Sequence, residues 1–222
     1  MEHDVAHDRS HGLPDNMLQS RLLITLGWMG ICGCAALIAG AVVAAFLVPN
    51  HDWISDTISD LAAGRSEIAM DIALYGFSVG LFATALGAAH LHPGGGAWST
   101  GIFCLAILAG IVIIVGARNE YGDSDSDGVV IHSYLVYALG LLFLAMPLCM
   151  AWALPHHHSR VRRVLIGLGL LWGCTAPVFF FLPTGIDGLY ERALGVIAAA
   201  MIVTLCTVFI GAGRLIRAER QA

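Results

Sequence analysis

The chain has 222 residues, of which 58% are hydrophobic and 12% charged, and its formal net charge is −5. Charged residues make up roughly 25% of soluble globular domains, so this composition excludes an ordinary soluble domain and indicates an integral membrane protein. All eleven basic residues are Arg and they form no basic stripe, which excludes a typical nucleic-acid partner. The Lys-free, Ala- and Gly-rich usage is typical of a bacterial protein.

Six apolar runs follow a polar N-terminal segment. Residues 1–21 show no apolar period and predict a disordered tail, and residues 214–222 predict a basic tail. Each apolar run is long enough to cross a bilayer, which takes roughly 20 residues. The expected spans are residues 22–48, 72–92, 97–117, 129–154, 164–182 and 193–213. The sequence therefore predicts an all-α fold, a six-helix membrane bundle in one domain.

The first two spans carry small residues at four-residue intervals. These residues are Ala36, Gly40 and Ala44 in the first span, and Gly76, Gly80 and Thr84 in the second. Small residues at this spacing let two helix backbones approach closely in a membrane. We therefore expect close helix contact along both stripes.

The Arg residues are distributed unevenly among the segments that connect the spans. If the N-terminus is cytoplasmic, eight of the eleven Arg lie in cytoplasmic segments, and eleven of the sixteen carboxylates lie on the other side. Because Arg-rich segments stay in the cytoplasm, both termini are expected there. The prediction is a multi-pass protein of the cell (inner) membrane, N-in and C-in.

The polar stretch of residues 51–71, between the first two spans, is expected to form an extracytoplasmic amphipathic cap. It places Asp52, Asp56 and Asp60 at four-residue intervals, with Ser59 beside them. If this stretch is helical, the three carboxylates share one face. That face lies in water on the membrane surface, or it folds over the bundle and presents an Asp to an Arg or a His.

Three further residues are candidates for a site on the same side. His132 lies about one turn inside the fourth span, where an ionisable residue usually faces the bundle interior. It is either an interfacial His or a partner for the Asp row, as a base, metal ligand or proton acceptor. Glu191 and Arg192 begin the sixth span, and Arg192 is either a surface anchor or an ion-pair partner of the Asp row.

A second acidic segment matches the opening of a calcium-binding loop. Asp123, Asp125 and Asp127 are followed by Gly128, as in the first half of an EF-hand. The twelfth position is Tyr134, which cannot supply a bidentate carboxylate, so a complete EF-hand is excluded. A partial Ca²⁺ site completed by another loop and a solvated acidic turn both remain open.

Three motifs, in their order along the chain, resemble a known family. They are ISDTISDLAAG at residues 54–64, a Gly-x-x-x-His from Gly128 to His132, and GLYER at residues 188–192. The chain is similar, over roughly residues 22–214, to the six-helix prokaryotic membrane proteins catalogued as domain of unknown function nine-nine-eight. The resemblance implies the fold and the membrane location, and no established activity.

A more distant likeness is to the Frag1/DRAM/Sfk1 membrane proteins. These carry an Ile-Ser-Asp-Thr segment after their first helix, as residues 54–57 do here. That likeness implies a connection with lipid and autophagy regulation.

Three functions follow, and the first is favoured. It is a non-enzymatic protein that binds a lipid, a cation or a protein partner (a second copy included) at its extracytoplasmic face. The second is a membrane-embedded enzyme acting on a lipid-like substrate, with His132 and Asp56 or Asp60 as acid/base groups or metal ligands. The third, a small transporter, ranks last because the span centres are nearly free of charged residues.

Overall fold

The computed structural model describes residues 15–61, 67–117, 131–183, 185–219 and 221, without the side chains of 15–18, 59, 117 and 131–133. Every regular element in this part is a helix. The long elements are α1 (Asp15–Leu47), α3 (Glu67–Leu91), α4 (Gly96–Ala117), α5 (Ile131–Ala153), α6 (Ser159–Thr175) and α7 (Asp187–Ala218). The short elements are α2 (Ile58–Leu61) and the 3₁₀ helices η1 (His156–His158) and η2 (Ala176–Phe181).

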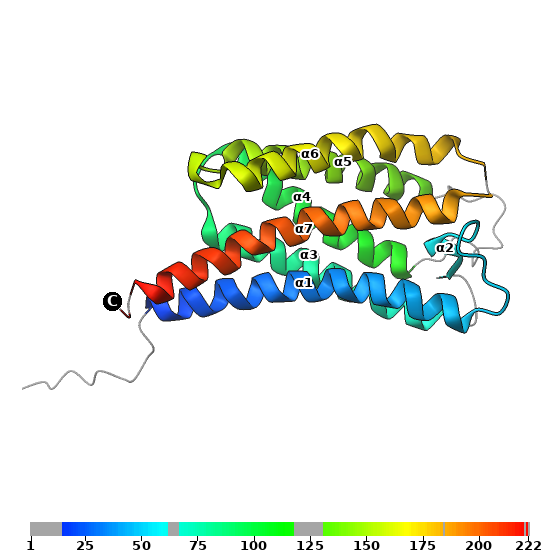
Figure 1. Cartoon of the computed structure of the whole chain (residues 1–222), viewed down its shortest axis with the longest axis horizontal. Helices are drawn as coiled ribbons and strands as arrows, with labels where there is room; N and C mark the ends of the chain where they lie inside the picture. Colours follow the sequence, from blue (N-terminus) through cyan, green and yellow to red (C-terminus); the bar gives the residue numbers. More distant parts are fainter. Residues whose placement is uncertain (1–14, 62–66, 118–130, 184, 220, 222) are drawn as a thin grey trace, which may run out of the picture.

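Six segments of the described chain are helical, long and apolar enough to cross a membrane, which confirms the all-α prediction. They lie side by side along one axis, and the α5–α6 hairpin packs against α4 and α7 (Figure 1). The start of α1 and the end of α7 lie at one end of the bundle, and α2 lies at the other. We call these the terminal end and the α2 end.

Small residues bring α1 and α3 into backbone contact. A Cβ atom added to Gly33 would lie 2.7 Å from the Cα atom of Gly80, which is closer than real side chains come. One added to Gly76 would lie 3.0 Å from the Cβ atom of Ala36, and Gly40 packs against Ala73. The close helix contact expected from the two stripes is confirmed, because the stripes face each other across this interface.

The prediction of a disordered segment at residues 1–21 is wrong for residues 15–21, which are helical. They contain no Gly or Pro, and Pro14 directly precedes them, which suits a helix start. The buried hydroxyl of Ser20 donates a 2.6 Å hydrogen bond to the carbonyl of Gly213, so α1 and α7 pack together to their ends. Residues 1–14 lie outside the described residues.

The fifth expected span, residues 164–182, is two helical segments rather than one. The α-helix α6 ends at Thr175, and Pro177 is the second residue of η2. Proline has no N–H to donate, and its ring crowds the carbonyl four residues earlier, so a proline kinks or ends an α-helix; α6 ends two residues before Pro177. The chain tightens into a 3₁₀ helix, in which the ring of Phe180 lies against that of Tyr137 in α5.

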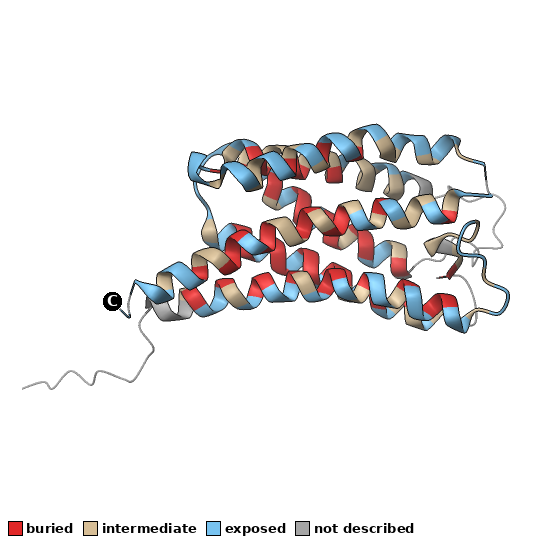
Figure 2. Ribbon diagram, viewed as in Figure 1, coloured by how far each residue is buried: buried red, intermediate tan, exposed pale blue. Residues whose placement is uncertain are grey.

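Buried residues gather where the helices face one another, and exposed ones cover the outside (Figure 2). The outside carries large apolar side chains such as Phe46, Phe103 and Trp152, each more than half exposed. Apolar surface of this extent is unfavourable in water and suits the hydrocarbon of a bilayer.

Candidate functional site

The α1–α2 loop, residues 48–57, folds around its own acidic side chains. It forms turns, and only Ile58–Leu61 is helical, so the expected helical face with three carboxylates is not formed. The reason is local: Asp side chains compete with the helix for backbone N–H groups. The Asp52 carboxylate accepts from the N–H of Ile54 at 2.9 Å, and the Asp56 carboxylate accepts from the N–H of Asp52 at 2.8 Å.

Thr57 and Asp60 form a capping box at the start of α2. The Thr57 hydroxyl accepts from the N–H of Asp60 at 3.1 Å, and the Asp60 carboxylate accepts from the N–H of Thr57 at 2.7 Å. This reciprocal pair satisfies two N–H groups that a helix start would otherwise leave without partners. It explains how one helical turn persists after an irregular loop.

Arg192, in the first turn and a half of α7, holds the loop from the opposite side. Its Nη1 donates to the carbonyls of Asp56 (2.7 Å) and Trp53 (3.3 Å), and its guanidinium lies over the Trp53 ring, 5.2 Å from the centroid. The expected pairing of Arg192 with an Asp carboxylate is therefore replaced by main-chain contacts. A guanidinium suits this role because its planar fork presents several donors at once.

His51 lies between Arg192 and Asp56, with its side chain 2% exposed. Its Nε2 is 3.0 Å from Nη2 of Arg192, and its Nδ1 is 3.1 Å from the Asp56 carboxylate. A guanidinium only donates, so Nε2 must accept, and the proton lies on Nδ1, which donates to Asp56. This geometry assigns the neutral Nδ1–H tautomer to His51.

The Asp56 carboxylate accepts hydrogen bonds from several groups of the loop. The N–H of Asp52 donates to it, and this hydrogen bond holds the pKa of Asp56 below its ordinary value. Burial opposes this effect but is weaker than the Asp52 hydrogen bond, and the hydrogen bonds of Ser55 and His51 lower the pKa of Asp56 further. Asp56 is therefore ionised at neutral pH.

Three more contacts join the loop to the start of α7. The N–H of Leu189 donates to the carbonyl of Ile54 at 3.0 Å, and Gly188 lies against the carbonyl of Asp56, where a side chain would collide. The N–H of Ile58 donates to the Glu191 carboxylate at 2.6 Å. We call this assembly of residues 51–58 with residues 188–192 the clasp.

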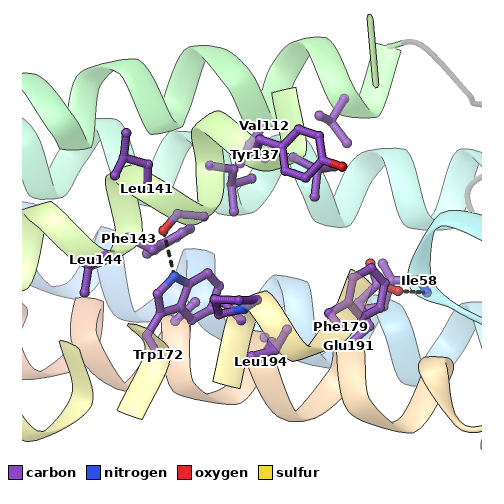
Figure 3. Close-up of a pocket in the computed structure, with 18 of the residues that line it drawn as sticks. Ile58, Val112, Tyr137, Leu141, Phe143, Leu144, Trp172, Phe179, Glu191 and Leu194 are labelled. Carbon is purple, nitrogen blue, oxygen red and sulfur yellow. Dashed lines mark hydrogen bonds between the residues drawn. The ribbon is translucent and has the colours of Figure 1, made fainter. Parts of the chain in front are cut away.

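An apolar cavity of about 600 Å³ lies beneath the clasp, enclosed mainly by α5, α6, η2 and α7, with further lining residues from α1, α3 and α4 (Figure 3). Its deep end is lined by Phe143, Leu144 and Trp172, and the Trp172 Nε1 donates to the carbonyl of Gly140 at 2.8 Å. All remaining described lining residues but Glu191 and Tyr137 have apolar side chains or none.

Glu191 and Ile58 line the α2 end of the cavity and also belong to the clasp. The loop therefore forms part of the cavity wall, and the Glu191 carboxylate is the one ionisable acid among its described lining residues. Tyr137 lies at the side, with its ring 4.6 Å from that of Phe180 in η2. The clasp and the cavity together are the candidate site.

A family model decides what kind of protein carries this site. The model of DUF998, described as a protein of unknown function, matches residues 31–208. The chain belongs to the DUF998 family. No curated protein and no solved structure matches it. Both halves of the clasp and all lining residues of the cavity fall inside the matched range, so the site is part of the DUF998 domain itself.

The structure brings some of the expected site residues of this DUF998 chain together. Asp52, Asp56, Glu191 and Arg192 meet in the clasp, and Asp60 caps the adjacent α2. Other expected positions are outside the described part: the side chains of Ser59 and His132, and all of Asp123, Asp125 and Asp127. Among described residues, no group of three or more His, Cys, Asp or Glu could hold a metal ion.

Several site residues were not expected from the sequence. His51 bridges Asp56 and Arg192, Gly188 permits the close approach of the loop, and Trp172 forms the deep wall of the cavity. One of the omissions had a readable signal: Thr57-x-x-Asp60 is the spacing of a capping box. Gly188 and the contact of His51 with Arg192 depend on segments more than 100 residues apart, which leave no local pattern. Trp172 reaches the cavity through the packing of α6 on α5.

Proposed function

We propose that this DUF998 protein binds one membrane amphiphile in the cavity beneath the clasp, at the extracytoplasmic end of the bundle. The volume and the apolar lining of the cavity support this proposal. Its volume of about 600 Å³ falls within the roughly 300–1,000 Å³ of small-molecule sites, and such sites are mostly apolar with a few placed polar groups. Of the ligands expected from the sequence, a lipid suits this apolar lining better than a free metal cation does. The carboxylates of Asp56 and Asp60, which could bind such a cation, lie outside the lining and already accept backbone N–H groups.

The cavity reaches the surface of the bundle between α5 and η2. Three of its lining side chains are largely exposed: Tyr137 at 55%, Leu141 at 67% and Phe181 at 87%. In a membrane these positions face hydrocarbon rather than water. A ligand can therefore enter sideways from the bilayer, with its chain leading and its polar end toward the clasp.

The size of the cavity favours a ligand with a single chain. A water molecule occupies about 30 Å³ in the liquid, so the cavity holds about twenty groups of that size. The stretch of α7 that lines it, from Glu191 to Ala198, is ~10 Å long at 1.5 Å per residue. One medium-length chain fits this space.

The proposal is tested by filling the cavity. Gly195 lines it, and a Cβ atom there meets no other atom within 4 Å, so Gly195→Leu places a side chain in the empty space. Gly211 lies in the same helix with equally open surroundings and does not line the cavity, so Gly211→Leu is the matched control. The ligand probe is a twelve-carbon alcohol with bromine on its chain, titrated into the purified protein in non-ionic detergent.

Bromine quenches tryptophan fluorescence at contact distance, and Trp172 lines the cavity. We expect saturable quenching in the wild type and in Gly211→Leu, and loss of the saturable part in Gly195→Leu. The variant Trp172→Phe should remove most of the saturable signal, which locates the probe. Quenching that never saturates, or that is equal in all of these variants, would overturn the proposal.

A further inference from the structure

The two ends of the cavity differ in chemistry. The deep end presents rings and aliphatic groups, and its one N–H donor, Nε1 of Trp172, is already satisfied by Gly140. The α2 end presents the Glu191 carboxylate (Figure 3). A ligand that fills the whole cavity must therefore place its apolar chain at the deep end and its polar group beside Glu191.

The partly buried Glu191 carboxylate has few hydrogen-bond donors. Among described residues it accepts one hydrogen bond, from the N–H of Ile58 to Oε2, and none reaches Oε1. The adjacent guanidinium of Arg192 uses Nη1 and Nη2 on Asp56, Trp53 and His51 instead. A carboxylate removed from water is unfavourable unless donors or an opposite charge compensate it.

The charges around Glu191 indicate which partner would compensate it. The charged side chains that act on it are Arg192, Asp60 and Asp187, so acidic groups outnumber the basic one. An anionic headgroup would add a further negative charge at this end. An ammonium group would supply both the missing donors and the opposite charge, and a hydroxyl would supply a donor only.

We propose that the ligand of this cavity is a single-chain amphiphile with a cationic amine head, which binds with its ammonium on Oε1 of Glu191 and its chain toward Trp172. This inference rests on the proposed amphiphile site and adds the chemical class of the headgroup. Glu191 acts as the headgroup acceptor, and the N–H of Ile58 holds its carboxylate in place from the other side.

The test is competition against the brominated alcohol by three unlabelled twelve-carbon compounds: dodecylamine, dodecanol and dodecanoate. At pH 7 the wild type should bind the amine about tenfold more tightly than the alcohol, a difference of about 1.4 kcal/mol, because only the ammonium makes a charge-assisted hydrogen bond to Glu191. Dodecanoate should be the weakest competitor. The variant Glu191→Gln should bind the amine no more tightly than the alcohol, because its amide has no charge to attract the ammonium, while its amide oxygen still accepts from Ile58.

Asp187→Asn is the control for a general loss of negative charge, since Asp187 begins the same helix and does not line the cavity. It should change the amine preference by at most about threefold. Equal competition by the three compounds in the wild type would overturn this inference and leave the amphiphile site intact. So would an amine preference that survives in Glu191→Gln. Failure of the proposed function is a different result, because the brominated alcohol itself would then show no saturable quenching.

Discussion

Asp56 is the residue at which both halves of the clasp meet. Its carboxylate accepts from the N–H of Asp52 and from His51, and its carbonyl accepts from Arg192. Because the folded protein lowers the pKa of Asp56, the ionised carboxylate stabilises the clasp at pH values above its unfolded pKa of about 4. That stabilisation is lost as the pH falls through the lower pKa of the folded state.

We expect Asp56→Asn to weaken the clasp at pH 7 and to have little effect at acid pH. The lost hydrogen bonds contribute about 1 kcal/mol, since the Asp56 side chain is 35% exposed and partly screened. Amide hydrogen exchange in residues 52–58 should then be about fivefold faster in the variant at pH 7. The ratio between variant and wild type should fall toward one as the pH is lowered through the folded-state pKa of Asp56, where the wild-type carboxyl gains its proton.

Glu219→Gln serves as the control, because Glu219 lies beyond the end of α7 and far from the clasp. It should leave exchange in residues 52–58 unchanged over the same pH range. A ratio for Asp56→Asn that stays constant as the pH falls through the folded-state pKa of Asp56 would show that the charge of Asp56 does not hold the loop.

The site could be predicted from the sequence only in part. The four-residue interval of Asp52, Asp56 and Asp60 suggested one helical face, yet each carboxylate binds a backbone N–H within four residues of itself. The interval is therefore a product of turn and cap chemistry. The contact between Ile58 and Glu191 joins residues 133 positions apart, and no local pattern predicts such a contact.

At the scale of elements, the closest packing is that of α1 on α3. A Cβ atom on Gly33 would lie 2.7 Å from the Cα of Gly80 and 2.9 Å from the carbonyl oxygen of Gly76. Both neighbours are backbone atoms of a packed helix, so neither can turn aside as a flexible side chain would. Any side chain at Gly33 must push the two helices apart.

We therefore expect Gly33→Ala to destabilise the bundle, by roughly 1–3 kcal/mol from overpacking. Gly110→Ala is the control, because a Cβ atom at Gly110 in α4 meets nothing within 4 Å. Alanine favours a helix over glycine by up to about 1 kcal/mol, so the control should be neutral or stabilising. The opposite signs should appear in the midpoints of SDS-induced unfolding, and a loss of stability shared by both variants would contradict the packing argument.

The helices themselves were predictable because hydropathy alone marks a segment that can cross a bilayer. Hydropathy does not predict where the helices begin and end. The segment of residues 15–21 is polar and yet helical, since Ser20 packs on Gly213 at the far end of α7. Pro177 is the second residue of η2, and the extent of this 3₁₀ helix follows from how the chain packs after α6.

At the scale of the whole molecule, basic residues gather at the terminal end of the bundle. Seven Arg residues lie in the described part of the chain, and only Arg192 is at the α2 end. The other six are Arg21, Arg160, Arg162, Arg163, Arg214 and Arg217. If the terminal end is cytoplasmic, as this distribution favours, the clasp and the polar end of the cavity face outward.

Reporter fusions in a bacterial cell test this orientation. A fluorescent protein that matures only in the cytoplasm, fused after Ala222, should fluoresce. Alkaline phosphatase, which is active only outside the cytoplasm, should be active when fused after Gly185, in the connection between η2 and α7 at the α2 end.

The same phosphatase fused after Gly95, in the connection between α3 and α4 at the terminal end, is the control and should be inactive. The reverse pattern would place the α2 end in the cytoplasm. Because the cavity opens sideways beneath the clasp, its ligand would then come from the inner leaflet, and the amphiphile would have to be sought among cytoplasmic lipids.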